Sequence, residues 1–342
     1  MIEVDGSRGE GGGQILRTAV ALSALTGQEV RVSGIRAGRP NPGLQPQHVC
    51  AVDGVGRLCA ARVEGNQTGS GQLVFRPGEV VPGRHRLRVG TAGSVTLVLQ
   101  ACLLATARCS EESLFEVEGG TNVRWSPPID FYDMTLFPLL ARMGARCEVE
   151  EMRRGFYPEG GGRALVRWKP PGRFAPLRME GRCGLKRIAG RTFTQNLPEH
   201  VGQRMGAAVR KAFLNQDVAL RSEGGSGPST GAGAFLVAEY EGGLLSADSL
   251  GERGVPAERV GEAAAAALKE EMSSSATVDV HVADQLLPYM ALADGESRVV
   301  VREVTGHLEA QAELVRTFLM AEVAFQPLDR GSEVRVRPHP YM

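Results

Sequence analysis

The chain has 342 residues, with 39 basic and 39 acidic side chains and an apolar share of 42%. This balance excludes a surface that is basic all over and coats polyanions, although a locally basic groove is compatible with it. The apolar share is too high for a disordered chain, and the length suggests about two domains. No run reaches the roughly 18 consecutive apolar residues that a membrane helix needs, so we expect no membrane association.

Six cysteines are spread along the chain without a CxxC pair, mostly in apolar surroundings. This spacing favours buried thiols in a reducing compartment over a disulfide framework or a zinc site. The first residues are acidic and lack the charge pattern of a signal peptide. We therefore expect a cytoplasmic protein.

The spacing of apolar residues predicts one order of elements twice in the first half of the chain. The first set has a strand over 1–5, a helix over 11–26, a strand over 29–34, a helix over 45–61 and strands near 62–65 and 72–76. The second set has a strand over 86–89, a helix over 93–107, a strand over 113–118, a helix over 130–143 and strands near 146–151 and 164–168. Both sets follow a βαβαββ plan with a period of roughly 80–85 residues.

A third set is interrupted. Its opening strand is predicted near 177–184, and after a long interval come a helix over 284–293, a strand over 298–303, a helix over 307–320 and strands near 322–326 and 332–337. The interval has its own strands and two helices, over 199–214 and 256–272, and is flanked by loops at 224–233 and 273–275. We predict a mixed α/β (α+β) fold, in which three βαβαββ units form a large domain, residues 1–184 and 279–342. A small α/β domain, residues 185–278, is inserted into the third unit.

The segment 8–17 (RGEGGGQILR) places a glycine turn directly before a predicted helix. The free N–H groups at such a helix start favour phosphate or sulfate. The segment lacks the GK[ST] of a Walker A motif, and Glu10 within it would repel a phosphate unless a divalent cation lies between them. A tight strand-to-helix turn without a ligand is the alternative.

A second segment, 35–48, contains Arg36, Arg39, Gln47 and His48 between prolines that stiffen the loop. The planar guanidinium group matches phosphate oxygens, and a rigid loop loses less entropy on binding. This density of donors favours an anion-binding loop over the alternative, a solvated surface loop.

The six histidines show no spacing typical of metal ligands. His307 follows a Thr-Gly pair at the predicted start of a helix, where the positive end of the helix dipole keeps an imidazole neutral and nucleophilic. His281 is predicted to lie on one face of a strand together with Asp279. For each histidine, a structural role is the more common alternative.

Seven motifs cover nearly the whole chain: GEGGGQILR (9–17), IRAGR with PGLQPQH (35–39, 42–48), GTAGSVTLVLQ (90–100), GGTNVRWSPPIDF (119–131), RGFYPEGGG (154–162), VADQLLPYMALA (282–293) and TGHLEAQ (305–311). In this order they resemble the motifs of the RNA 3′-terminal phosphate cyclase family. The resemblance implies three βαβαββ units, similar to the C-terminal fold of a bacterial translation initiation factor, with a thioredoxin-like domain inserted into the third. It agrees with the pattern of predicted elements.

The resemblance also implies a reaction in three steps. A histidine attacks the α-phosphate of ATP, AMP then passes to an RNA 3′-phosphate end, and the neighbouring 2′-hydroxyl closes a 2′,3′-cyclic phosphate and releases AMP. ATP and a divalent cation, Mg²⁺ or Mn²⁺, are the implied cofactors. RNA 3′-phosphate ends are the implied partner, with no membrane and no obligate protein partner.

Residue by residue, the resemblance makes His307 the adenylylated nucleophile, with Asp284 near it and Glu10 near the metal. Adenine would lie between Pro127 and His281. The residues implied to line the ATP site are Gln100, Pro127, His281, Val282, Ala283, Asp284 and Gln285. Those implied to contact phosphates and the RNA end are Arg17, Arg36, Arg39, Gln47 and His48. The family often has a tyrosine where His281 stands, and an imidazole stacks more weakly on a base.

Two other functions are considered. A non-catalytic factor in ribosomal RNA maturation has the same fold but lacks the nucleophilic histidine, so His307 argues against it. A sugar-phosphate transferase with a similarly repeated body would form no adenylate.

Overall fold

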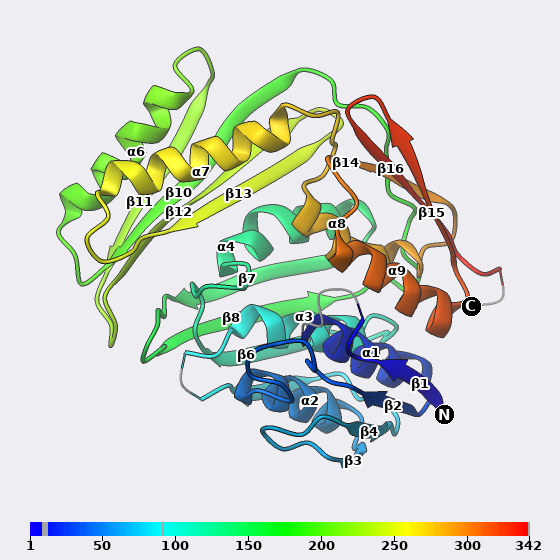
Figure 1. The fold of residues 1–342 in the computed structure, drawn as a ribbon. Helices are drawn as coiled ribbons and strands as arrows, with labels where there is room; N and C mark the ends of the chain where they lie inside the picture. The colour runs from blue at the N-terminus through cyan, green and yellow to red at the C-terminus, as the bar shows by residue number, and fades with distance from the viewer. Residues whose placement is uncertain (9–12, 91, 341–342) are drawn as a thin grey trace.

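The computed structural model of the protein describes residues 1–8, 13–90 and 92–340. These residues form a mixed α/β fold in which helices pack between and against four-stranded sheets (Figure 1). The predicted mixed α/β class is therefore confirmed. No helix in the described ranges is both long and apolar enough to cross a membrane.

Three sheets share one strand order: the first, second, fourth and third strand of each set along the chain lie side by side. In each, the first pair is parallel and the other two pairs are antiparallel. In spatial order, the first contains β1 (Ile2–Asp5), β2 (Val30–Ser33), β4 (Leu73–Arg76) and β3 (Arg62–Glu64). The second contains β5 (Arg84–Arg88), β6 (Ser113–Gly119), β8 (Gly162–Lys169) and β7 (Arg146–Arg153). The third contains β9 (Arg178–Met179), β14 (Ser297–Val301), β16 (Gly331–Arg337) and β15 (Glu322–Leu328). The strand predicted near 177–184 is thus much shorter than expected.

The fourth sheet has the order β11 (Val218–Gly225), β10 (Leu185–Gln195), β12 (Gly231–Tyr240) and β13 (Leu244–Leu250). Helices α6 (Glu199–Ala212) and α7 (Ala257–Met272) lie side by side along it (Figure 1). The loop predicted over 224–233 is shorter than expected. It spans only 226–230, because β11 continues to Gly225 and β12 begins at Gly231, where the paired neighbours hold the glycines extended.

Five helices meet in the middle of the molecule: α1 (Gly13–Thr26), α2 (Pro46–Leu58), α3 (Val95–Ala105), α8 (Val280–Met290) and α9 (Gly306–Leu319). Helix α3 is buried along almost its whole length, as expected of a helix that is apolar on all sides. The helix predicted over 130–143 consists of three consecutive pieces: α4 (Ile129–Phe131), the π-helical turn η1 (Tyr132–Leu136) and α5 (Phe137–Arg142). Together these helices set the geometry of the site described below.

The prediction of a strand around His281 is wrong, because this residue lies in the first turn of helix α8. The Asp279 carboxylate accepts hydrogen bonds from the backbone N–H groups of His281 and Val282, at 3.1 and 2.9 Å, and so caps α8. An aspartate at this position satisfies N–H groups that a helix start leaves free. Helix α8 therefore begins at Val280, ahead of the predicted 284. Asp279 is buried while the side chain of His281 is exposed, so the two do not share a strand face.

Candidate active site

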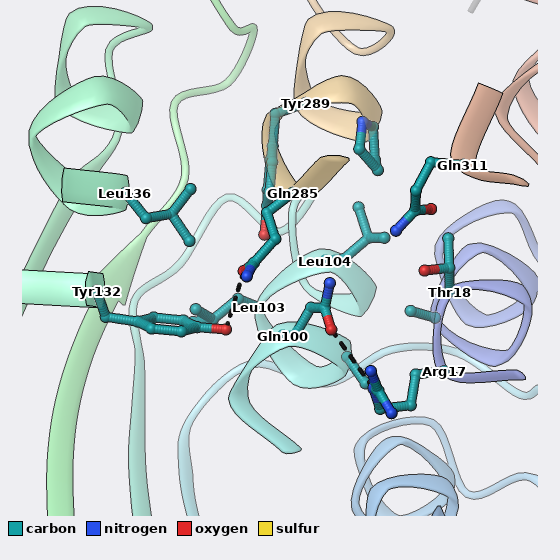
Figure 2. Close-up of a pocket in the computed structure, with 13 residues that line it drawn as sticks. Arg17, Thr18, Gln100, Leu103, Leu104, Tyr132, Leu136, Gln285, Tyr289 and Gln311 are labelled. Carbon is teal, nitrogen blue, oxygen red and sulfur yellow. Dashed lines mark hydrogen bonds between the residues drawn. The ribbon is translucent and has the colours of Figure 1, made fainter. Parts of the chain in front are cut away.

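Polar side chains from four of the central helices line a small cavity in the core (Figure 2). They are Arg17 of α1, Gln100 of α3, Gln285 of α8 and Gln311 of α9, with the Tyr132 hydroxyl at one side. The Arg17 Nε donates to Gln100 Oε1 at 3.4 Å. The cavity leaves about 10 Å³ for the centre of a water molecule, which is room for about one water. Polar groups are thus gathered here without space for a larger ligand inside the cavity itself.

Two amide oxygens at this centre are buried without a hydrogen-bond donor among the described residues. They are Gln14 Oε1, from the first turn of α1, and Gln311 Oε1. A buried acceptor without a donor costs about 1–3 kcal/mol, so such groups fit a site that a polar ligand or water completes.

Arg17 is a buried cation in this centre, with only 7% of its surface exposed. Burial lowers the pKa of Arg17 to about 10, and the nearby Tyr132 and Asp284 act in the opposite direction. The guanidinium is therefore still charged near pH 7. A buried guanidinium that lacks a fully ionised carboxylate suits the oxygens of a phosphate.

Asp284 is a carboxyl group whose charge acts on Arg17, and it is itself buried. Burial raises the pKa of Asp284 to about 7, although His281, a hydrogen bond from Gln14 and Arg17 each lower it. The side chain is then only partly ionised at neutral pH. Because Asp284 is only partly ionised, it does not fully neutralise the positive charge of Arg17. It can also exchange a proton near neutral pH.

We expect the stability of the protein to fall as the pH rises from about 4 to 7, and Asp284→Asn to flatten this fall. Because the folded pKa lies above the ordinary value of 3.8, the native state holds a proton in this window that the unfolded chain has lost. Ionisation of the buried group then destabilises the fold, by on the order of a few kcal/mol. Urea midpoints at several pH values test this. Parallel profiles for the wild type and Asp284→Asn would contradict it.

His48 lies in the first turn of α2, is 3% exposed, and accepts a hydrogen bond from the Gln45 N–H on Nδ1 at 3.0 Å. Burial lowers the pKa of His48 to about 3, helped by the charges of Arg17 and Arg36. Its ring is therefore neutral, with its proton on Nε2. Toward a phosphate it would act as a hydrogen-bond donor and not as a positive charge.

Helices α1 and α2 approach so closely at Gly13 that only a glycine fits. A Cβ atom there would lie 2.0 Å from His48 Nε2 and 2.9 Å from Arg17 Nη1. Gly13 thus allows the Arg17 guanidinium and the His48 Nε2–H to lie close to each other at the start of α1.

The loop that carries Arg36 closes on itself. The Arg36 backbone is left-handed, at φ 55°, and its Nη1 donates to the carbonyl oxygens of Asn41 at 2.6 Å and Gly43 at 3.3 Å. Burial, together with Arg39, lowers the pKa of Arg36. Arg39 is exposed on the same loop, and Gln47 is half-buried next to His48. The loop is therefore rigid, as the prolines predicted, and its Arg36 charge lies close to His48.

His307 lies in the first turn of α9 and is partly buried. The Thr305 Oγ1 caps this helix by accepting from the Leu308 N–H at 3.1 Å. The predicted helix start is thus confirmed. Gln311 follows one helical turn after His307, so α9 presents both residues toward the same side of the helix.

The remaining sequence-predicted residues fall in different places. The Pro127 carbonyl accepts a hydrogen bond from Thr96 Oγ1 at 2.7 Å, one helical turn before Gln100 on α3. Val282 and Ala283 are buried in the apolar core. Glu10 lies outside the described residues.

A metal ion finds no ready cage in the described parts of the chain, because no group of three or more His, Cys, Asp or Glu side chains comes together there. All six cysteines lie within the described ranges and are free thiols.

Sequence reasoning did not single out Gln14, Tyr132 or Gln311. Gln311 had one signal, its position four residues after His307 on a predicted helix. Tyr132 had none, because its contact with Gln285 joins segments 153 residues apart (3.2 Å between hydroxyl and Oε1).

The fold and this centre define a mixed α/β protein with a buried, phosphate-compatible site where polar side chains of several helices meet. A family model described as RNA 3′-terminal phosphate cyclase matches residues 8–325. The protein of that name from Nitrosospira multiformis is 45% identical over 344 residues, covering 99% of this chain and 97% of its own. The one from Methanopyrus kandleri is 43% identical and covers 99% of this chain and 99% of its own. The one from Archaeoglobus fulgidus is also 43% identical and covers 95% of this chain and 98% of its own. The chain belongs to the RNA 3′-terminal phosphate cyclase family.

Proposed function

We propose that the protein converts an RNA 3′-terminal phosphate into a 2′,3′-cyclic phosphodiester at the expense of ATP. His307 attacks the α-phosphorus, so that an N–P bond forms and pyrophosphate leaves. An RNA 3′-phosphate oxygen then attacks the same phosphorus, which breaks the N–P bond. Finally the 2′-hydroxyl attacks the 3′-phosphorus, loses its proton and displaces AMP. Family membership supports the overall reaction, and the cytoplasm is the proposed place of action.

One observation carries the proposal: a buried guanidinium, Arg17, lies in a centre where two buried amide oxygens have no hydrogen-bond donor among the described residues. Arg17 belongs to α1, and α1 packs against α9, the helix that carries His307. Arg17 and the His48 Nε2–H would hold phosphate oxygens, which places charge next to the phosphorus under attack. The N-terminal end of α9 favours a neutral imidazole before attack and stabilises the phosphate attached to it afterwards. The ribose keeps the 2′-hydroxyl next to its own phosphate, so ring closure benefits from proximity.

For the nucleotide itself, we propose that Pro127 and His281 flank adenine and that Gln100 and Gln285 line the site. Arg36, Arg39 and Gln47 would contact the RNA end. A divalent cation near Glu10 would neutralise the charge of the leaving pyrophosphate and AMP. This role of Glu10 rests on the family resemblance alone.

We also propose that the chain divides as its sequence suggested, with residues 1–184 and 279–342 in the large domain and 185–278 in a thioredoxin-like insert. The strand order that three sheets share, and that the fourth sheet does not have, supports three related units. The fourth sheet, covered by α6 and α7 and with an apolar cluster of its own, supports a separate small body.

The test is incubation of the protein with ATP labelled in the α-phosphate and a divalent cation. We expect release of pyrophosphate and an acid-labile, hydroxylamine-resistant label on the protein, and on addition of RNA with a 3′-phosphate, a 2′,3′-cyclic end. Absence of pyrophosphate release on mixing with ATP would favour the sugar-phosphate transferase, which needs no adenylate, or the non-catalytic factor over the cyclase.

Gly13→Ala should lower kcat/KM for cyclisation by about 10- to 100-fold, because small displacements of positioning groups have effects of this size. The new Cβ would push His48 and Arg17 apart, since it would lie 2.0 Å from His48 Nε2. Steady-state kinetics with a short 3′-phosphorylated RNA measure the effect.

Gly38→Ala is the matched control, since a Cβ there meets no atom within 4 Å although the residue lies in the loop between Arg36 and Arg39. We expect its kinetics to match the wild type. Equal losses in both variants would show that Gly13 has no special place in the site.

A further inference from the structure

Trp125 is the most exposed large apolar side chain among the described residues, with 93% of its surface accessible. Its backbone is left-handed, at φ 67°, a conformation that a bulky residue adopts at a cost. The chain on both sides of it is buried: Asn122 is 1% exposed and Ile129 is fully buried. A strained backbone that turns an indole outward from a buried segment points to a function for the ring.

The segment around Trp125 is anchored on both sides. Ser126 Oγ donates to the Val123 carbonyl at 3.1 Å, and the Ile129 N–H donates to the Thr121 carbonyl at 2.9 Å. Next to the tryptophan, Arg124 forms an ion pair with Glu252, two residues after the end of β13. The indole is therefore presented by a fixed loop, which reduces the entropy lost when a flat ligand stacks on it.

The loop also leads directly into the candidate site. Pro127 follows two residues later, and its carbonyl is held by Thr96, one helical turn before Gln100. A ligand on the indole would thus lie at the outer edge of the site, in solvent. A free nucleotide buries most of its surface in its pocket, whereas an RNA strand must leave the site through its rim.

On this basis we propose that Trp125 is a stacking platform for a base near the 3′ end of the single-stranded RNA substrate. The inference rests on the proposed function for the presence of RNA, and adds to it a contact outside the nucleotide site. Aromatic rings stack on any base, so the platform would hold the strand without selecting its sequence.

Intrinsic fluorescence reads this contact directly, because the chain has two tryptophans and the other, Trp168, is fully buried. Acrylamide should therefore quench mainly Trp125. We expect a short single-stranded RNA with a 3′-phosphate to change this emission and protect it from acrylamide. The same RNA with abasic sites at its last positions should not, nor should ATP alone. A response to ATP alone, or an equal response to the abasic RNA, would overturn the proposal.

Trp125→Ala should raise KM for RNA about 5- to 150-fold, the range that stacking of about 1–3 kcal/mol predicts. Trp125→Phe should restore part of the loss, and the rate of protein adenylylation by ATP should not change in either. Leu214→Ala is the control, an exposed apolar residue (79%) just after α6. An unchanged KM in Trp125→Ala would refute the platform, as would a change in oligomeric state, which would assign the ring to a protein contact.

Failure of the proposed function is distinguishable from failure of this inference. If the wild type forms no protein-bound adenylate but RNA still protects Trp125, the catalytic proposal fails and the stacking contact stands. If adenylylation proceeds and RNA leaves Trp125 unaffected, the stacking contact fails alone.

Discussion

His307→Asn should lower protein adenylylation by at least about 10³-fold while the protein remains folded. A covalent mechanism loses its intermediate when the nucleophile is removed, and the amide of asparagine is a poor nucleophile. The fold should tolerate the change, because His307 is only partly buried and α9 is capped by Thr305. Transfer of label from α-labelled ATP to the protein measures the effect.

A supplied RNA that already carries the activated 3′-diphosphate end makes this experiment sharper. The last step uses the 2′-hydroxyl of the RNA and not the imidazole, so His307→Asn should still close the cyclic phosphate and release AMP from this substrate. Loss of this step too would mean that the variant damages the site as a whole.

His200→Asn is the matched control. His200 is the second residue of α6 and exposed, just as His307 is the second residue of α9. The two helix positions are alike, so any general effect of a histidine at a helix start appears in both variants. Label that persists in His307→Asn, or is lost equally in His200→Asn, would refute the assigned nucleophile.

Much of the fold follows from local pattern. The helix over 256–272 was predicted within one residue, because alanine-rich chain with regular apolar spacing has a single favourable conformation. The strand prediction at 278–282 failed because three alternating valines are compatible both with a strand and with the start of a helix. The deciding contact came from Ser246, whose N–H and Oγ hold the capping Asp279 carboxylate at 2.9 and 2.8 Å.

The site was predictable to the extent that its motifs are contiguous. Arg17, His48 and Gln100 could be named from three separate segments, but the close approach at Gly13 that joins Arg17 and His48 depends on how two helices pack. Gln311 and Tyr132 needed the same tertiary information. The burial that sets the pKa values of Arg17 and Asp284 is a property of the packed core and not of sequence spacing.

A buried ion cluster that joins the fourth sheet to the rest of the protein was also beyond sequence reasoning. Asp130, fully buried, binds Arg154 through both oxygens at 2.7 and 3.0 Å, and Arg191 of β10 reaches it at 3.2 Å. Arg154 also pairs with Glu223 of β11 and lies 4.0 Å from the centre of the Phe193 ring. The cluster therefore links α4, which follows Pro127, to two strands of the fourth sheet.

We expect Arg154→Met to lower the free energy of unfolding by about 3–5 kcal/mol, since it leaves a buried carboxylate with only part of its compensation. Burial on its own would raise the pKa of Asp130, but the hydrogen bond and charge of Arg154, with Arg191, hold that pKa below its usual range. The stability that this carboxylate contributes is therefore present at neutral pH and lost as the pH falls below about 4. Urea unfolding at pH 7 and at several pH values below 4 measures both effects.

Arg187→Met is the control for a change of arginine to methionine in this sheet. Arg187 lies on β10 and pairs with Glu239 through two contacts of 2.9 Å, but the Arg187 side chain is 49% exposed. An exposed pair of this kind is worth about 0–1 kcal/mol. In the double variant Asp130→Asn/Arg154→Met part of the loss should be recovered, because the unpaired charge is gone. A loss in Arg154→Met no larger than in Arg187→Met would mean that the cluster does not stabilise the junction of the fourth sheet with the segment after Pro127.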